Sequence, residues 1–327
     1  MTTNTSILLS FLKLGNREFL SGETLATEHG ISRVAINARI KKLGQSGIVF
    51  EAVPRRGYRL AKEPAQLHAD LLQAHLFING PNLTVQVIPE TDSTNLEVER
   101  RLASGETAPI AVIAHNQTEG RGRMGRIWHS TDPRNLYLSI GFRPETLGTA
   151  IANFSLWVGV KLAEILQSET DLPVQVKWPN DLQVGGRKIA GILCEAKMEL
   201  DRVQTLVFGF GLNVNQDADN LPVDLRTPGT TLKTLLGRTV AIHPLTTAVL
   251  QAVLDGYSAS QQANSSQLLQ QTFSQFDALR DQLVTTHNGS TETQGTARGI
   301  DEHGNLLLQT TEGNTIPIPA GDVSLKK

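Results

Sequence analysis

The sequence predicts an α+β, multidomain protein with an N-terminal winged helix-turn-helix, a central mixed β-sheet with helices on one side, and a small C-terminal β-barrel. Three observations support this fold class. Short helical patterns and a hairpin pattern fill a basic segment at the start of the chain. Strand and helix patterns mix through the middle, and short strands punctuated by Gly and Thr fill the end. The length of 327 residues suits two or three such domains.

Residues 1–62 have the pattern of three short helices followed by a β-hairpin. Ser21 is expected to cap the second helix and Gly30 to end it, and Ser32 is expected to cap the third. Two short helices joined by a tight, glycine-containing turn are typical of a helix-turn-helix. The arginine-bearing turn at 54–57, between two apolar runs, predicts the wing.

The charge of the chain is unevenly distributed. Residues 1–62 contain 10 Lys/Arg and 4 Asp/Glu, a net charge of +6, whereas the remaining residues carry −8. A basic N-terminal segment (residues 1–62, called the head below) followed by an acidic remainder favours DNA as the partner of the head. The alternative is that the head is a basic helical bundle that binds a protein. The third helix is expected in the major groove and the wing on phosphates. The residues expected to contact DNA are Ser32, Arg33, Asn37, Arg39, Lys41, Arg55 and Arg56.

The rest of the chain divides into three segments. Residues 63–82 are expected to form a linker with one short helix, residues 83–272 the main domain, and residues 273–327 the small β-barrel. The expected strands are Val85–Ile88, Ile110–Ala114, Leu136–Phe142, Val174–Trp178, Leu182–Val184, Lys188–Ala196 and Leu206–Val214, and the expected helices are Ala150–Gln167 and Leu245–Ser258.

Composition narrows the class of protein. Hydrophobic residues make up 39% of the chain and charged residues 19%, as in an ordinary globular protein. No apolar run approaches the roughly 20 residues that a membrane span needs, and the N-terminus is interpreted as a helix rather than a signal peptide. The single cysteine, Cys194, excludes an internal disulfide, fits a cytoplasmic protein and is expected to be a buried structural thiol. No tightly bound metal is expected, because no His/Cys cluster has zinc spacing.

The densest candidate site is the run Gln117–Arg126, in which three glycines alternate with three arginines after a buried-type strand. Glycines let backbone N–H groups turn toward an anion, and arginines add forked donors for phosphate or carboxylate. The run therefore favours anion binding over its alternative, a solvated basic loop. It is not a Walker P-loop, because no Gly-Lys-Ser/Thr follows.

A second cluster joins 177–181 to 187–191 across a hairpin. Asn180 and Asp181 follow Pro179 at a strand exit, where they are either site residues or ordinary turn residues. Lys188 lies on an otherwise apolar strand, so its amine either reaches solvent or faces a ligand anion.

Two further segments have polar residues at strand ends. The run Asp92–Asn95 precedes a helical stretch, so at least one of these residues is expected to cap the helix, while the others remain free to bind a polar ring. The run Gly209–Asn215 closes a strand with two glycines and two asparagines, which indicates a bulge or a close approach to a ligand.

In order and spacing, these motifs resemble the biotin–protein ligases, in the form that doubles as biotin operon repressor, over essentially the whole chain. The strongest matches are Gly120–Arg126 with Trp128, Lys177–Asp181 and Arg187–Ile192. Weaker matches are Ser93–Asn95, Gly211–Asn213 and Gly299–Asp301.

The resemblance implies roles for single residues. Lys188 and Arg123 are implied in catalysis, with Lys188 bridging the biotin carboxylate and the α-phosphate. Asp181 is implied as a possible magnesium contact. Biotin is implied to contact Ser93, Thr94, Asn95, Gln117, Arg121, Gly122, Arg123 and Lys188. ATP or the adenylate is implied to contact Arg123, Arg126, Trp128, Asn180, Asp181, Lys188 and Asn213.

The resemblance also implies an activity and partners. It implies ATP-dependent formation of biotinoyl-5′-AMP, with ATP, Mg²⁺ and biotin as substrates, and transfer of biotin to a lysine of biotin carboxyl carrier protein. It implies a class II synthetase-like central domain, an SH3-like barrel, and a homodimer, promoted by the adenylate, that binds operator DNA and represses biotin-synthesis genes. The alternatives are a lipoate-type protein ligase, a non-enzymatic biotin-sensing DNA-binding regulator and a ligase without a regulatory head.

The chain departs from the family pattern at two places. Met124 occupies a position that is often basic in the family, which bears on how the loop becomes ordered. The segment 215–231, where the family has its adenine-covering loop, contains no Trp, Tyr or Phe. Aromatic stacking on adenine from that loop is therefore not expected.

Overall fold

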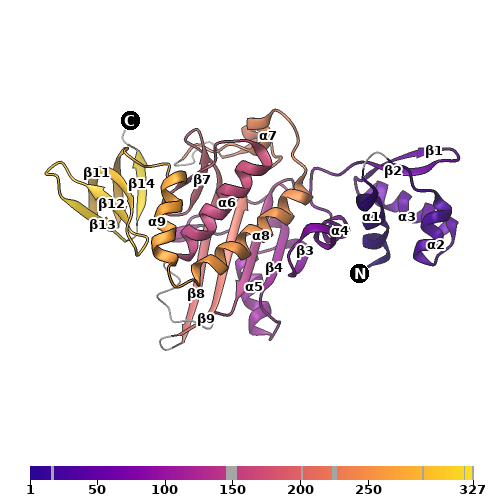
Figure 1. The fold of residues 1–327 in the computed structure, drawn as a ribbon, viewed down its shortest axis with the longest axis horizontal. Coiled ribbons are helices and arrows are strands. Elements are labelled where there is room, and N and C mark those ends of the chain that lie inside the picture. Colours follow the sequence, from indigo (N-terminus) through magenta and orange to yellow (C-terminus); the bar gives the residue numbers. More distant parts are fainter. Residues whose placement is uncertain are drawn as a thin grey trace.

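The computed structural model describes residues 1–327 except 16–17, 145–152, 200–201, 223–226, 289–290, 320 and 326–327. The molecule is elongated, with the N-terminal unit and the C-terminal sheet at opposite ends of a large central sheet (Figure 1). This arrangement confirms the predicted α+β, multidomain class. In the described part of the chain, no helix is both long and apolar enough to cross a bilayer.

The N-terminal unit is the predicted helix-turn-helix with a hairpin. The hydroxyls of Ser21 and Ser32 accept hydrogen bonds from the backbone N–H of Thr24 and Ala35, which satisfies free donors at both helix starts. Gly30 ends the second helix in the left-handed conformation, with φ 64°. The elements are α1 (Thr3–Leu14), α2 (Gly22–His29), α3 (Arg33–Gln45), β1 (Val49–Val53) and β2 (Gly57–Lys62).

The segment predicted as a linker contains α4 (Ala69–Asn79), which packs on both neighbours. Leu71 is buried in the core of the N-terminal unit, whereas the adjacent Leu72 is buried in the core of the central sheet. Asp70 accepts a hydrogen bond from the hydroxyl of Thr5 in α1 at 2.8 Å. The segment is therefore a structural bridge as well as a connection between two units.

The central sheet has seven strands in the order β3-β4-β5-β9-β8-β7-β6, and only the β3–β4 pair is parallel. The strands are β3 (Thr84–Thr91), β4 (Ile110–Gln117), β5 (Leu136–Phe142), β6 (Gln175–Lys177), β7 (Asp181–Val184), β8 (Arg187–Glu199) and β9 (Arg202–Leu212).

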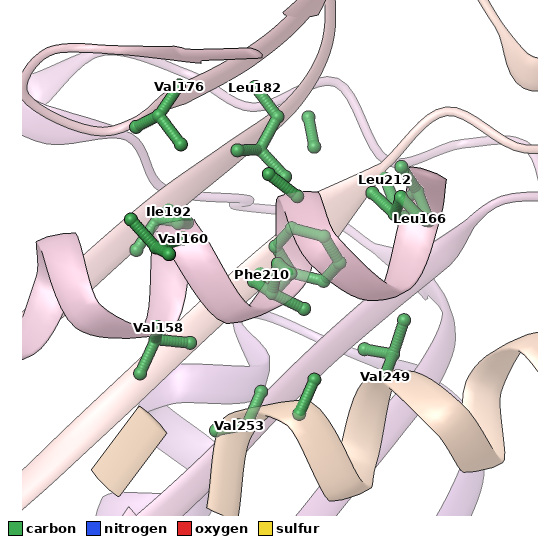
Figure 2. Close-up of a cluster of buried hydrophobic side chains, with 14 of the residues drawn as sticks. Val158, Val160, Leu166, Val176, Leu182, Ile192, Phe210, Leu212, Val249 and Val253 are labelled. Carbon is green, nitrogen blue, oxygen red and sulfur yellow. The ribbon is translucent and has the colours of Figure 1, made fainter. Parts of the chain in front are cut away.

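Two long helices, α6 (Phe154–Thr170) and α8 (Ile242–Ser260), cover one face of this sheet, as predicted, and form the main core with it (Figure 2). The shorter α5 (Thr94–Ala103) packs on the opposite face, against β4, β5 and β9, which the expectation of helices on one side did not include. The expected start of the α6 helix at Ala150 lies outside the described residues.

The C-terminal unit is a five-stranded antiparallel sheet in the order β13-β12-β11-β10-β14. The helices that directly precede this sheet in the chain are the short α7 (Leu232–Leu236), the long α8 and then α9 (Ser265–Phe276). Because α9 spans residue 273, the expected start of the C-terminal domain falls inside a helix. The strands are β10 (Leu283–Asn288), β11 (Thr291–Ile300), β12 (Leu306–Gln309), β13 (Thr315–Ile318) and β14 (Asp322–Leu325).

A cluster of one carboxylate and two histidines, half-buried or fully buried, lies where the N-terminal unit meets the central domain. Glu63, directly after β2, is 2.8 Å from Nε2 of His75 on α4 and 2.9 Å from Nδ1 of His243 on α8. The second contact lacks the angle of a well-formed hydrogen bond and is chiefly electrostatic. His243 is fully buried, and its Nε2 accepts the backbone N–H of His68 at 2.9 Å. The cluster thus ties the bridge to both of its ends.

This cluster makes stability depend on pH. Burial lowers the pKa of His243 below its ordinary 6.5 and outweighs the attraction of Glu63. Burial alone would raise the pKa of Glu63, but the contacts with His243 and His75 lower it from 4.5 to about 2. Because the unfolded chain binds more protons, the free energy of unfolding should fall as the pH drops below 6.5, and fall again below 4.5 as Glu63 loses its contribution.

Urea unfolding between pH 8 and pH 5 measures this trend. The matched variant is His243→Gln, which keeps an acceptor for the His68 N–H but does not titrate. We expect its stability to change less over this range than that of the unaltered chain. Equal pH dependence in the two proteins would show that the His243 cluster does not set the trend.

Candidate active site and nucleic-acid interface

A pocket opens on the face of the central sheet that α6 and α8 leave uncovered. Its floor comes from β8 and β9. Its walls come from the start of α5, the end of β4 with the glycine–arginine loop that follows, the turn between β6 and β7, the segment after β9, and β14. The predicted site residues that line it are Ser93, Thr94, Asn95, Gln117, Arg121, Gly122, Arg123, Arg126, Trp128, Asn180, Asp181, Lys188 and Asn213. The fold therefore brings the whole predicted ligand set into one pocket.

Glycines on two neighbouring strands make the floor of the pocket flat. A Cβ on Gly211 would overlap the indole of Trp128, and a Cβ on Gly209 would overlap the amide of Asn95. At Gly191 a Cβ would lie 3.0 Å from the same indole. The glycines that the sequence marked as a close approach thus make room for two predicted ligand-binding side chains.

The polar end of the pocket is a hydrogen-bonded group at the start of α5. The backbone N–H and the hydroxyl of Thr94 both donate to Oε1 of Gln117, at 2.8 and 3.0 Å. The hydroxyl of Ser139 on β5 donates to Oδ1 of Asn95 at 2.6 Å, and Asn95 donates to Glu195 at 2.7 Å. Donors and acceptors are therefore held in fixed directions, as recognition of a small polar ring requires.

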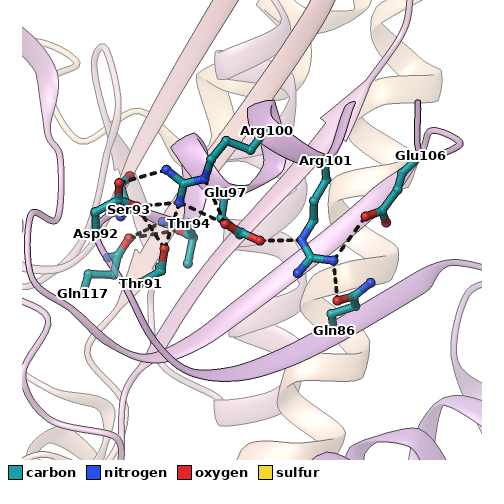
Figure 3. A network of polar contacts seen from close by, with 10 residues as sticks. All are labelled: Gln86, Thr91, Asp92, Ser93, Thr94, Glu97, Arg100, Arg101, Glu106 and Gln117. Carbon is teal, nitrogen blue, oxygen red and sulfur yellow. Dashed lines mark hydrogen bonds and ion pairs between the residues drawn. The ribbon is translucent and has the colours of Figure 1, made fainter. Parts of the chain in front are cut away.

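Ser93 takes the N-cap position of α5, but its side chain makes no capping hydrogen bond. The residues around it are fixed by ion pairs instead (Figure 3). Arg100 contacts Asp92 at 2.8 Å and Glu97 at 2.9 Å, and hydrogen bonds from Arg100 hold the pKa of Asp92 well below its ordinary value. The Asp92 carboxylate in turn accepts the N–H of Ser93 at 2.6 Å, which orients the start of the helix.

The cationic end of the pocket contains Lys188 and Arg123. Nζ of Lys188 is 2.7 Å from Oδ1 of Asp181 and lies over the ring of Trp128, 5.2 Å from its centroid. Of the two orientations that the sequence left open, the structure shows the lysine facing the pocket. Arg123 donates to Oδ1 of Asn180 at 3.4 Å, and burial lowers the pKa of its guanidinium. A half-buried arginine beside a lysine is suited to binding an anion.

The other two loop arginines lie at the rim. Arg121 is 3.8 Å from Glu195 on β8, and Arg126 pairs with Asp322 on β14 of the C-terminal sheet. Met124 lies between them, with a left-handed φ of 57° and 63% of its surface exposed. The C-terminal unit therefore contacts the loop directly.

The segment after β9 forms the remaining wall. The side-chain amide of Asn213 donates to the carbonyl of Thr230 at 3.2 Å, and the N–H of Lys188 donates to the carbonyl of Pro228 at 2.8 Å. Residues 223–226 of this segment lie outside the described part. Leu221 and Pro222 line the pocket, so this wall presents an aliphatic surface to a ligand. The sequence contains no Trp, Tyr or Phe in 215–231 that could stack there instead.

The side chains of the pocket show what kind of metal ion it could hold. Among the described residues, no group of three or more His, Cys, Asp or Glu side chains is placed to hold one. The pocket does contain the carboxylate of Asp181. Mg²⁺ is usually held by one or two carboxylates together with substrate phosphates, so Asp181 fits an ion that arrives with a nucleotide.

The predicted DNA-contacting residues lie on α3, at its N-cap and at the turn between β1 and β2. Arg33, Asn37 and Lys41 are exposed on α3. Arg39 is half-buried, and its guanidinium donates to Oδ1 of Asn4 in α1 at 3.0 Å. Ser32 caps α3, Arg55 at the hairpin turn has φ 68°, and the guanidinium of Arg56 stacks 4.3 Å from the ring of Phe19.

The site also contains residues that the motifs did not reveal. Ser139, Glu195 and Asp322 are separated in sequence from the motif residues that they contact. Glu195 had one signal, a lone acid at the end of the apolar run that contains Cys194, whereas nothing in the sequence pointed to Asp322.

Three family models match the chain. The Biotin/lipoate A/B protein ligase family matches residues 86–213, the Biotin protein ligase C terminal domain matches residues 284–326, and an HTH domain matches residues 7–59.

Whole-chain relatives agree with these matches. The "Bifunctional ligase/repressor BirA" of Salmonella typhimurium is 36% identical, over 99% of this chain and 98% of that protein. The protein of the same name from Bacillus spizizenii is 32% identical over 94% of each. The solved structure "Biotin protein ligase from Aquifex aeolicus in complex with biotin and ATP" is 27% identical, with a TM-score of 0.64, and the match covers 75% of this chain and 99% of that one. The chain therefore belongs to the biotin–protein ligase family, among the bifunctional ligase/repressors.

Proposed function

We propose that this protein activates biotin with ATP to biotinoyl-5′-AMP and transfers the biotin to a specific lysine of biotin carboxyl carrier protein. We further propose that it represses biotin-synthesis genes in the cytoplasm with the adenylate as corepressor. One observation carries the ligase proposal: a fixed polar group around Thr94 and Gln117 and a cationic pair, Lys188 and Arg123, line the same pocket. The first suits a neutral ring, and the second suits the anions that react.

Each part of the pocket receives a role in this proposal. Ser93, Thr94, Asn95 and Gln117 hold the ureido ring of biotin. Arg121, Gly122 and Arg123 lie over biotin and the adenylate phosphate, and Lys188 bridges the carboxylate and the α-phosphate. Asn180, Asn213, Arg126 and Trp128 contact the nucleotide. The Mycobacterium tuberculosis relative named "Biotin--[acetyl-CoA-carboxylase] ligase", the Aquifex aeolicus structure with biotin and ATP, and the position of these residues in the pocket support the assignments.

The first step joins two anions. A carboxylate oxygen of biotin attacks the α-phosphorus of ATP, the bond from that phosphorus to the bridging oxygen breaks, and pyrophosphate leaves with the electron pair. Lys188 and Arg123 reduce the repulsion between carboxylate and phosphate and stabilise the charge that develops on the phosphoryl oxygens. Asp181 pairs with Lys188 in this structure, so the biotin carboxylate and the α-phosphate would replace Asp181 as partners of the lysine.

The second step needs positioning more than acid–base chemistry. A neutral lysine amine of the carrier protein attacks the anhydride carbonyl, AMP leaves, and the amide nitrogen loses a proton to solvent. The loop at 121–126 lies at the rim of the pocket, where Arg126 pairs with Asp322, and its closure over the bound ligand would keep water from the anhydride. Mg²⁺ would supply further neutralisation of the triphosphate, with Asp181 as its protein ligand.

Pyrophosphate release with different acids tests the proposal against its alternatives. We expect release with biotin and ATP, and none with lipoate or octanoate in place of biotin. Release with lipoate instead of biotin would identify a lipoate-type ligase. A protein that binds biotin and releases no pyrophosphate would be a non-enzymatic sensor.

Repression is proposed to depend on dimerisation. One winged unit contacts a half-site, so specific repression needs a dimer that matches a two-fold operator. Ordering of the glycine-rich loop by the adenylate would remove an entropic cost from dimerisation, with a coupling of about 1–3 kcal/mol. Sedimentation with and without biotinoyl-5′-AMP should show the dimer favoured by the ligand. An unchanged monomer–dimer equilibrium would contradict this coupling.

A further inference from the structure

Four residues form one exposed line along α3. Val34, Asn37, Ala38 and Lys41 are spaced i, i+3, i+4 and i+7, so they share one face of the helix. All four are exposed, whereas Ile36, Ile40 and Leu43 on the opposite face are buried in the core of the N-terminal unit. We call these four residues the α3 stripe.

The composition of the α3 stripe is unusual for a surface that meets only water. Val34 is 80% exposed, and Ala38 beside it is also apolar. Asn37 is exposed, and among the described residues no hydrogen bond occupies its side chain. The α3 stripe thus presents two apolar contacts and one amide that is free to donate and to accept.

The surroundings of the stripe are cationic. The helix α3 contains no acidic residue, and Lys42 lies beside Lys41 at its end. The side chain of Arg33 extends along Gly22 at the start of α2 and lies beside the stripe. Phosphate contacts from these cations would position the helix without reading the bases, whereas the stripe between them has the chemistry to read bases.

We propose that the α3 stripe reads A·T base pairs in the major groove of duplex DNA. Val34 and Ala38 contact the 5-methyl groups of thymines, and the amide of Asn37 pairs with N6 and N7 of an adenine. Apolar contact with the thymine methyl and an Asn–adenine pair are the ways in which these side chains distinguish bases. This inference rests on the proposed repressor function and adds the base composition of its site.

The dimensions fit a short core of the half-site. Seven residues of helix rise about 10 Å, which spans about three base pairs at 3.4 Å each. Val34 lies in the first turn of α3, the end of a recognition helix that reaches base edges. Lys41, at the other end, lies where the helix leaves the groove and meets phosphate.

The experiment starts from a duplex of known sequence. The full chain, incubated with biotin and Mg-ATP, selects binding sites from a library of random duplexes at low salt. Single thymines of the selected duplex are then replaced by deoxyuridine, which removes only the 5-methyl group. At the positions that Val34 contacts, we expect affinity to fall about fourfold, the effect of one buried methyl group.

The Val34→Ala variant shows whether the 5-methyl group of the thymine contacts the side chain of Val34. The variant should bind the thymine duplex several-fold more weakly and should lose its sensitivity to deoxyuridine at one position. Val49→Ala is the matched control, because Val49 is also exposed, at 49%, and lies on β1 outside the stripe. That variant should keep the full response to deoxyuridine.

The affinity of the Asn37→Ala protein is measured for duplexes in which one A·T pair is replaced by G·C. Its preference for A·T at one position should fall about tenfold. A selected duplex whose affinity is unaffected by deoxyuridine at every position, or a Val34→Ala protein that still responds to it, would overturn the inference while the repressor function stands. A full chain that selects no duplex at low salt would overturn both.

Discussion

Lys188→Ala is expected to slow biotin-dependent pyrophosphate release by about 10²–10³-fold, the effect of removing one preorganised group that stabilises developing charge. The structure places the ammonium in the pocket, 2.7 Å from Asp181 and over the ring of Trp128. Its loss leaves the biotin carboxylate and the α-phosphate to approach each other with one cation fewer. The half-buried Arg123 remains, so a residual rate is expected.

The Lys188→Ala protein should stay folded. Lys188 and Asp181 are 24% and 19% exposed, so water still reaches the carboxylate that loses its partner, and the free energy of unfolding should fall by about 1–3 kcal/mol. Arg187→Ala is the matched control, because Arg187 is adjacent on β8 but exposed, and its side chain contacts the carbonyl of Gly229. It should keep a near-normal rate. Near-normal pyrophosphate release by a folded Lys188→Ala protein would remove Lys188 from the mechanism.

Deletion of residues 1–62 is expected to abolish DNA binding and to leave adenylation intact. Among the residues that the structure describes, the central core begins at Leu67 and includes none from 1–62. The deletion retains Glu63 and therefore the contacts with His75 and His243. It exposes Leu71 of α4, which is fully buried in the intact chain, so the shortened protein should be less soluble.

Adenylation and retention on DNA, measured for both proteins, test this division. Adding Leu71→Ser to the shortened chain removes the newly exposed apolar side chain and should restore solubility without changing the rate. A folded, soluble shortened chain that fails to form the adenylate would show that the head takes part in the chemistry.

Local patterns were sufficient to predict much of the fold. The caps at Ser21 and Ser32 and the left-handed Gly30 follow from chemistry within a few residues, and the structure has them where they were expected. The strand pattern located all seven strands of the central sheet, because alternation and apolar runs are local signals. The glycine–arginine loop was recognised because its two residue types recur within ten positions.

Contacts between distant segments were not predictable in this way. Arg126 meets Asp322 only because the C-terminal sheet docks beside the pocket, and no local pattern shows that docking. The hydrogen bond from Arg39 on α3 to Asn4 on α1 likewise joins two helices that no local pattern places side by side, and the DNA contact of Arg39 stays a prediction. Alternation also shows which residues share a face of a strand without showing what covers that face. A helix after Asn95 was therefore expected, but its packing on the far side of the sheet was not.

The mass of a biotin carrier domain tests the central claim most directly. The full chain is incubated with biotin, Mg-ATP and the carrier domain, and the intact carrier is weighed by mass spectrometry. We predict the addition of one biotinoyl group at a single lysine, which disappears without ATP and when that lysine is replaced by arginine. A carrier of unchanged mass, in the presence of a folded protein and all three substrates, would contradict the account.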